Sequence, residues 1–332
     1  MTTPTPELFG SPHPSISVIL PVLNEEAHLN DAVHSILSQD YQGKIEVILA
    51  VGPSRDRTQE IAQSISDRDS RVVLVDNPTG RTAAGLNLAL NKSQNPVVVR
   101  VDGHAQIPND YLRLIVEILN ETRAVNVGGV MAAVGSTSFE RAVAGAMRSP
   151  LGVGASRFHT GGKAGVVDTV YLGAFRREAL VAIGGFDERF TRAQDWELNF
   201  RLREKGGIVY FDPRLHVTYR PRSTVTALAK QYFEYGRWRR VVSRRHSGTI
   251  NYRYLAPPFA LIGFLSSVIA GFFLPILFFP AAIYLLFLLL ASARIASSIR
   301  EYFLLLAVIP TMHFAWGAGF ISSPKTLVPS SD

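Results

Sequence analysis

Residues 16–21 read ISVILP, and three runs of the same kind follow: IEVILAV at 45–51, RVVLVD at 71–76 and PVVVRVD at 96–102. Each run is short, apolar and rich in β-branched residues, which predicts a buried strand. Amphipathic stretches that predict helices lie near residues 25–38, 58–66, 82–90 and 111–120. Apolar strands that alternate with helices predict an α/β fold, with a mostly parallel sheet covered on both faces.

The composition narrows the class of protein. The chain has 332 residues, enough for about two domains, and 47% of them are hydrophobic while only 18% are charged. Such a balance excludes disordered, collagen-like and coiled-coil chains. The absence of cysteine excludes a disulfide framework, thiolate metal sites and a cysteine nucleophile.

The C-terminal third predicts membrane-crossing helices. Residues 255–293 contain no charged side chain, and this run is too long for one span of about 20 residues. It predicts two helices, 255–274 and 276–293, joined at a turn near Pro275. A third apolar stretch, 302–321, is also long enough to cross. If it spans the membrane, the C-terminus lies outside the cell; if it is a re-entrant segment, the C-terminus stays inside.

The distribution of positive charge predicts the orientation. The net charge is +7, and residues 220–246 hold eight Lys or Arg against one acid, Glu234. The positive-inside rule puts this block on the cytoplasmic side, together with the loop of Arg294 and Arg300. The first 15 residues lack the apolar core of a signal peptide. We therefore expect a multi-pass protein of the cell (inner or plasma) membrane whose catalytic domain is cytoplasmic.

Polar residues follow each of the four predicted strands. They are Asn24 and Glu25 after the first, Asp56 after the second, Arg81 after the third, and Asp102 and His104 after the fourth. Ligands of parallel sheets bind at these carboxyl ends. No glycine-rich loop follows the first strand, which argues against a P-loop ATPase or a nicotinamide-dependent dehydrogenase. A divalent cation would then balance the charge of a bound diphosphate.

Four motifs carry a resemblance to a known family. SVILPVLNEE, RVDGHAQIPNDYL, GGFDERF with QDWELNFRLREKG, and QYFEYGRW occur in that order. The chain, over residues 15–320, resembles the inverting glycosyltransferases of family 2 with the GT-A fold, and among them the membrane-bound succinoglycan-type glucosyltransferases. The resemblance implies transfer of a sugar from a nucleotide-diphospho-sugar to a lipid-linked or membrane-proximal acceptor, such as a polyprenyl-linked sugar, in cell-envelope glycan or polysaccharide synthesis.

The resemblance implies a Mn²⁺ or Mg²⁺ site at Asp102 and His104. The family has D-x-D here, and histidine replaces the second carboxylate in this chain. Alternate residues of an extended chain point the same way, so both side chains reach one ion. An imidazole ligand favours Mn²⁺ over Mg²⁺. In the alternative interpretation Asp102 caps a turn at the strand end and His104 is solvated.

The resemblance also implies that Asp195 is the general base that deprotonates the acceptor hydroxyl. The residue before it is Gln194, where the family motif has glutamate. The alternative is an acid that only stabilises the first turn of a helix. Glu197 lies roughly 200° further around that helix, so we expect it to form a salt bridge instead.

Side chains after the four strands are implied to contact the nucleotide sugar: Pro21, Asn24, Glu25, Asp56, Arg81 and Asp102. A UDP-sugar is the favoured donor. Gly52 departs from the family, which often has an acid there to recognise the base, and this puts uracil recognition in doubt. For Asn24 and Asp56 the alternative is that they cap loops.

Gln231, Arg237 and Trp238 resemble the family's Gln-x-x-Arg-Trp motif, with three more residues between Gln and Arg-Trp. The motif implies a lid over donor and acceptor sugars. The same helix also has the pattern of an interfacial helix whose aromatic residues sit at lipid head groups. Residues 142–163 show no period and predict an acceptor loop.

These observations predict five segments: a disordered N-terminus at 1–14, a GT-A catalytic domain at 15–222, a basic interfacial helix at 223–254, two to three transmembrane helices at 255–321, and a tail at 322–332. A catalytically inactive membrane scaffold with the same fold is the alternative function. Nucleic acid is not an expected partner, because the aromatic residues of the basic block have the spacing of a lipid-facing helix.

Overall fold

The computed structural model describes residues 8–328. The predicted disordered N-terminus and tail therefore fall partly, at 1–7 and 329–332, outside the described residues. The chain forms two compact units: residues up to 131 with 161–218 make the first, and 132–160 with 219 onward make the second.

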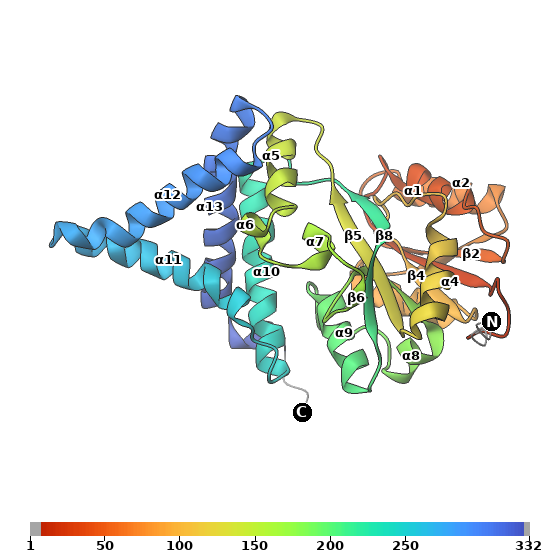
Figure 1. The fold of residues 1–332 in the computed structure, drawn as a ribbon. Coiled ribbons are helices and arrows are strands. Elements are labelled where there is room, and N and C mark those ends of the chain that lie inside the picture. The colour runs from red at the N-terminus through yellow and green to blue at the C-terminus, as the bar shows by residue number, and fades with distance from the viewer. Residues whose placement is uncertain (1–7, 329–332) are drawn as a thin grey trace, which may run out of the picture. The chain divides into compact units, whose positions relative to one another are not determined.

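The first unit is built on an eight-stranded sheet of order β3-β2-β1-β4-β7-β5-β8-β6 (Figure 1). The strands are β1 (Ile16–Val22), β2 (Ile45–Val51), β3 (Val72–Asp76), β4 (Val97–Arg100), β5 (Asn126–Ala133), β6 (Gly165–Val166), β7 (Tyr171–Arg176) and β8 (Val209–Tyr219). β1 pairs in parallel with β2 and β4, and β2 with β3. The four predicted strands are confirmed, and they form the parallel half of the sheet.

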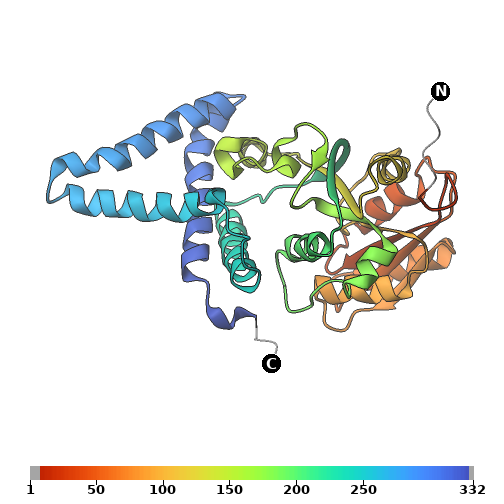
Figure 2. The same ribbon diagram turned by 60° about the horizontal axis from the view of Figure 1, so that its bottom comes forward.

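Helices cover both faces of this sheet (Figure 2). They are α1 (Leu29–Leu37), α2 (Thr58–Arg68), α3 (Thr82–Lys92), α4 (Tyr111–Thr122), α8 (Arg177–Ala182) and α9 (Gln194–Glu204). Alternate residues of β1 face opposite cores: Val18 and Leu20 pack with α1 and α4, whereas Ile19 packs with α3 and α9. Side chains of one strand point to both faces in turn, so burial on both faces explains why these strands are continuously apolar.

The other half of the sheet is antiparallel, because β7 runs opposite to both β4 and β5. The apolar pattern did not predict these strands. In β5 the backbone approaches β8 so closely that a Cβ on Gly129 would lie 1.7 Å from the Leu215 carbonyl oxygen. Glycines remove the alternation of side chains that identifies a strand in the sequence.

The second unit is helical. Its elements are α5 (Ser138–Met147), α6 (Pro150–Val153), α7 (Arg157–Thr160), α10 (Val225–Arg245), α11 (Tyr252–Gly271), the 3₁₀ turn η1 (Pro275–Phe278), α12 (Phe279–Ile295), α13 (Ile299–Ser322) and the 3₁₀ turn η2 (Lys325–Leu327). The predicted loop at 142–163 is wrong, since this segment contains most of α5 and all of α6 and α7. The missed signal is a capping box, in which Thr137 and Glu140 each bond the other's backbone N–H.

Three helical segments of this unit are long and apolar enough to cross a membrane: 252–271, 275–295 and 299–322. The predicted turn between the first two is confirmed, because η1 begins at Pro275 and Pro280 lies in the first turn of α12. α13 makes its most extensive helix contact with α10. The two backbones touch where a Cβ on Gly236 would lie 2.0 Å from the Trp316 carbonyl oxygen.

Candidate functional site

The residues predicted to bind ligand gather at the carboxyl ends of the parallel strands. In the order β3-β2-β1-β4, the chain leaves β1 toward one side and enters β4 on the other. The crevice at such a switch point is the usual ligand site of an open α/β sheet. Asn24 and Glu25 follow β1 directly, and Asp102 and His104 follow β4, so these four residues flank this switch point.

Arg100, the last residue of β4, joins Asp102, the predicted cation ligand, to Asp195, the predicted general base. Its Nε and Nη2 donate to one oxygen of Asp102 at 3.1 and 3.0 Å, and its Nη1 donates to Asp195. The Arg100 side chain is only 7% exposed, whereas the carboxylates of Asp102 and Asp195 are 20% and 28% exposed. A buried guanidinium therefore holds both acids at the floor of one site.

Each of these carboxylates keeps one oxygen for a ligand. Arg100 occupies Oδ1 of Asp102 and Oδ1 of Asp195, and among residues 8–328 neither Oδ2 has a hydrogen-bond partner. Asp195 lies in the first turn of α9, after Ala193 in the left-handed region at φ 60°. Such a conformation is strained for a residue other than glycine, and it turns the chain sharply into the helix that carries Asp195.

The electrostatic surroundings change the protonation of Asp195. Burial raises the pKa of Asp195 to about 6, Arg100 opposes the rise and Asp102 adds to it. For Arg100 burial lowers the pKa, but the two carboxylates outweigh it and the net pKa shift is upward. Arg100 therefore stays charged, while Asp195 exchanges its proton near neutral pH.

His104 is held by Glu25 across the switch point. Its Nδ1 lies 2.8 Å from Oε1 of Glu25. The connecting Gly103 packs tightly, since a Cβ there would lie 3.0 Å from Cγ of Glu25 and 3.1 Å from Val22. A carboxylate bonded to one ring nitrogen is the arrangement that orients histidine ligands in metal sites. Within the described residues, however, no three His, Asp or Glu side chains gather as a metal cluster.

Asn24 and Asp56 tie two loops together. Oδ1 of Asn24 accepts the N–H of Arg55 at 2.8 Å, and the carboxylate of Asp56 accepts the N–H groups of Glu26 and Thr58 at 3.1 Å. The Thr58 hydroxyl lowers the pKa of Asp56 by donating to it. The loop-capping interpretation left open for both residues therefore describes their contacts in this structure.

The remaining predicted donor contacts lie at the same edge. Pro21 is in β1, beside Ala50 of β2, and Arg81 is exposed just before α3. At Gly52 a Cβ would lie 3.1 Å from both the Cα of Gly80 and a methyl of Leu23. A side chain at position 52 would therefore require the loops after β2 and β3 to move apart slightly.

The predicted lid residues belong to the second unit. On α10, Nε2 of Gln231 donates to the hydroxyls of Tyr219 and Tyr235, while its Oε1 is buried without a hydrogen-bond partner. Arg237 pairs with Glu234 at 2.8 Å, and Trp238 is buried. Their role as a lid stays a prediction.

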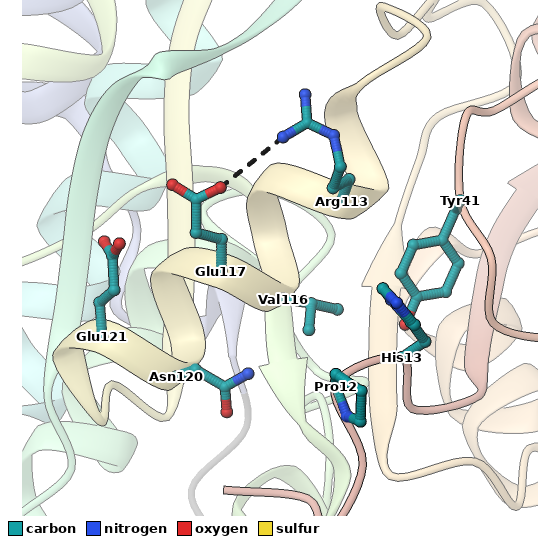
Figure 3. A pocket seen from close by; sticks show the side chains of 8 residues that line it. All are labelled: Pro12, His13, Tyr41, Arg113, Val116, Glu117, Asn120 and Glu121. Carbon is teal, nitrogen blue, oxygen red and sulfur yellow. Dashed lines mark ion pairs between the residues drawn. The ribbon is translucent and has the colours of Figure 1, made fainter. Parts of the chain in front are cut away.

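A hollow of about 330 Å³ lies at the opposite, amino-terminal edge of the strands (Figure 3). Tyr41 and His13 line one side, and Glu117 and Glu121 of α4 line the other, with Arg113 paired to Glu117. It contains none of the predicted site residues. The residues predicted for catalysis and for the cation, Asp195, Asp102 and His104, all lie outside this hollow.

Sequence patterns did not identify Arg100 as a site residue. They correctly predicted a salt bridge at Glu197. Glu197 is buried and pairs with Arg201 at 2.7 Å, as expected. Arg100 interrupts the apolar run PVVVRVD, and a charge inside a strand buried on both faces was the available signal. Its partner Asp195 is 95 residues away, so the pairing itself was not visible.

The fold and this site define the chain as a glycosyltransferase of the GT-A class. The mannosyltransferase PcManGT of Pyrobaculum calidifontis, solved in complex with GDP-Man and Mn²⁺, has a similar fold, with a TM-score of 0.60 and 21% identity over 94% of this chain and 87% of that one. The model of glycosyl transferase family 2 matches residues 17–184, and the chain belongs to this family.

Two relatives match over nearly the whole chain. The succinoglycan biosynthesis protein ExoA of Rhizobium meliloti (strain 1021) is 31% identical, over 91% of this chain and 93% of its own length. A Methanococcus voltae enzyme, dolichyl N-acetyl-alpha-D-glucosaminyl phosphate 3-beta-D-2,3-diacetamido-2,3-dideoxy-beta-D-glucuronosyltransferase, is 24% identical over 86% and 89%.

Proposed function

We propose that this glycosyltransferase moves a sugar from a nucleoside-diphospho-sugar, with inversion, to a hydroxyl of a lipid-linked or membrane-proximal acceptor. The observation that carries the proposal is that one buried arginine, Arg100, pairs with both Asp102 and Asp195 at the switch point of the sheet. An inverting displacement needs one carboxylate base on the acceptor side and one charged site for the leaving diphosphate. The cluster supplies both within one site.

Asp195 is the proposed general base. Its Oδ2 accepts the proton of the acceptor hydroxyl while the oxygen attacks the anomeric carbon from the face opposite the diphosphate. The bond from the anomeric carbon to the phosphate oxygen breaks in the same displacement, so no enzyme nucleophile is required. A pKa of about 6 suits a base that works near neutral pH, because the base is then deprotonated yet still attracts the proton.

Asp102 and His104 are the proposed protein ligands of a divalent cation. The chain turns here instead of continuing extended as predicted, since the N–H of Ala105 donates to the carbonyl oxygen of Asp102 at 2.9 Å. The donor types nevertheless fit: Asp102 has an oxygen without a hydrogen-bond partner among residues 8–328, and Glu25 orients the His104 ring. Two protein ligands are few, which is typical of cations that complete their shell with substrate phosphates and water. When bound, the cation supplies Lewis acidity that stabilises the leaving nucleoside diphosphate. The PcManGT complex, which contains Mn²⁺, supports this proposal.

A membrane-bound acceptor fits the second unit. α11 has 20 residues and is therefore about 30 Å long, the thickness of the hydrocarbon core. The dolichyl phosphate substrate in the name of the Methanococcus voltae relative supports a lipid-linked acceptor. We keep a UDP-sugar as the first donor to test, with GDP-sugars beside it because of Gly52.

For the topology, we propose that α11 and α12 cross the cell membrane as a hairpin and that α13 lies along its cytoplasmic surface. Of the apolar window of α13, 39% is buried inside the protein, against 17% and 22% for the other two segments. Its last turns lie against α10 near Arg240 and Arg244, and Glu301 in its first turn pairs with Arg141 at 3.0 Å. If α13 crossed, its two ends would place Arg141 and the arginines of α10 on opposite sides of the membrane, whereas both belong to segments expected on the cytoplasmic side.

The activity is tested with membranes that contain the full chain, a panel of radiolabelled nucleotide sugars, and Mn²⁺, Mg²⁺ or EDTA. We expect label in the organic extract from one donor, with metal, and none above background for Asp195→Asn or Asp102→Ala. Asp67→Asn, which removes an exposed acid near the C-terminal end of α2, is the matched control and should transfer normally. No transfer from any donor, or full transfer by Asp195→Asn, would favour the inactive scaffold.

The topology is tested by cysteine labelling, since the chain has no native cysteine. We expect Phe273→Cys at the hairpin tip to react with an impermeant maleimide in intact cells. Ser297→Cys and Lys325→Cys should react only after the cells are opened. Labelling of Lys325→Cys in intact cells would show that α13 crosses.

A further inference from the structure

The second unit contains a hollow of about 340 Å³ where the N-terminal turns of α11 meet the last turn of α13. Arg240 and Arg244 of α10 form its charged side, and Phe259, Ile262, Phe320 and Ile321 form its apolar side. Its volume lies within the roughly 300–1,000 Å³ typical of ligand sites. A hollow with two cations at one side and apolar walls at the other matches an amphiphile with an anionic head.

The two arginines lack a counter-charge among residues 8–328. No acid lines the hollow, and among residues 8–328 no carboxylate pairs with Arg240 or Arg244. The nearby acid, Glu234, already pairs with Arg237 at 2.8 Å. Like charges four residues apart on a helix repel each other, and burial followed by the charge of Arg240 lowers the pKa of Arg244. An anion between the two guanidiniums would relieve this repulsion.

Other contacts fix where the guanidiniums sit. Arg244 donates to the carbonyl oxygens of Ser323 and Pro324 at 2.9 and 3.1 Å, and Arg240 lies 5.0 Å above the ring of Phe320. These partners are neutral, so within the described part of the chain, residues 8–328, neither charge is compensated. Arginine in such a fixed position is well suited to bind phosphate oxygens.

The apolar walls belong to helices that are long enough to cross a membrane. Phe259 is 68% exposed, and Ile262 and Ile321 are each 50% exposed. Phe259 and Ile262 line the hollow together with the two arginines, and α11 continues beyond them with further apolar residues. A lipid presents its phosphate and then its acyl chains in the same order. We propose that this hollow binds the phosphate head group of an anionic bilayer phospholipid, with its chains against α11 and α13.

Native mass spectrometry of the detergent-purified full chain tests the proposal without any transfer reaction. Phosphatidylglycerol and phosphatidylcholine with identical chains are added at the same molar excess. We expect wild type to retain at least one phosphatidylglycerol where phosphatidylcholine dissociates. Each arginine near an anionic head group contributes roughly five-fold, so Arg240→Gln with Arg244→Gln should weaken retention about thirty-fold.

Two further variants separate charge from folding. Arg222→Gln with Lys230→Gln removes the same charge from exposed positions outside the hollow and should retain the lipid. Phe259→Glu keeps both arginines, changes an exposed residue, and should repel the phosphate. Equal retention of the two lipids by wild type, or unchanged retention by both hollow variants, overturns the proposal. If inorganic phosphate alone displaces the bound phosphatidylglycerol, the hollow is a free-anion site and the proposal is overturned. If polyprenyl phosphate displaces phosphatidylglycerol and is not displaced by it in turn, the hollow is an acceptor-lipid site and the proposal is likewise overturned.

Discussion

The ion pair between Arg100 and Asp195 predicts how transfer depends on pH. A base with a pKa of about 6 is about 91% deprotonated at pH 7 and about 9% at pH 5, so kcat/KM should fall roughly ten-fold between them. In Arg100→Gln the buried carboxylate loses its cation. An opposite charge at this range lowers an acid's pKa by about 1 to 3 units, so the midpoint should move up to about 7 to 9.

The assay is kcat/KM for the transferred label from pH 5 to 9.5, at saturating Mn²⁺. At pH 7 the expected loss in Arg100→Gln is between about two-fold and about ninety-fold, and activity should recover as the pH rises. Arg100→Lys keeps the charge and should keep the midpoint closer to wild type. A profile of Arg100→Gln that is lower at every pH, with the same midpoint as wild type, would refute the reasoning, because it would mean that Arg100 only supports the fold.

Four further outcomes are expected. Asp195→Asn should lower the transfer rate about 10²- to 10⁴-fold. The folded pKa of Asp195 lies above its ordinary value, so the charged form destabilises the fold as pH rises from 3.8 through about 6. At pH 7.5 Asp195→Asn should therefore be more stable than wild type by up to roughly 3 kcal/mol. This difference in the free energy of unfolding, measured by thermal unfolding, should decrease toward pH 5. His104→Ala should weaken activation of transfer by Mn²⁺, and Glu25→Gln should weaken it about 10- to 100-fold, as measured by titrating transfer with the metal. Activation equal to that of wild type in both variants would show that neither residue belongs to the cation site. Gly52→Asp should destabilise the first unit by about 1 to 3 kcal/mol, since its side chain meets Gly80, and unchanged unfolding would contradict the close approach.

The sequence by itself determined the parallel half of the sheet and the apolar hairpin. The strands at 16–22, 45–51, 72–76 and 97–100 are buried on both faces, so burial alone made them continuous apolar runs. The turn at Pro275 followed from the preference of proline for the first turn of a helix, since η1 begins at Pro275 and Pro280 lies in the first turn of α12. The ends of the strands then located the site, because all carboxyl ends of parallel strands share one edge.

The antiparallel half of the sheet and the charge arrangement of the site were decided only by the tertiary structure. β5 is rich in glycine, and its pairing with β7 joins residues far apart in the chain, which no local pattern encodes. Asp102 and Asp195 could each be selected from a motif, but only folding brings both to Arg100. The pKa of Asp195 depends on burial and on charges contributed by another strand, and these exist only after the strand and α9 have packed together.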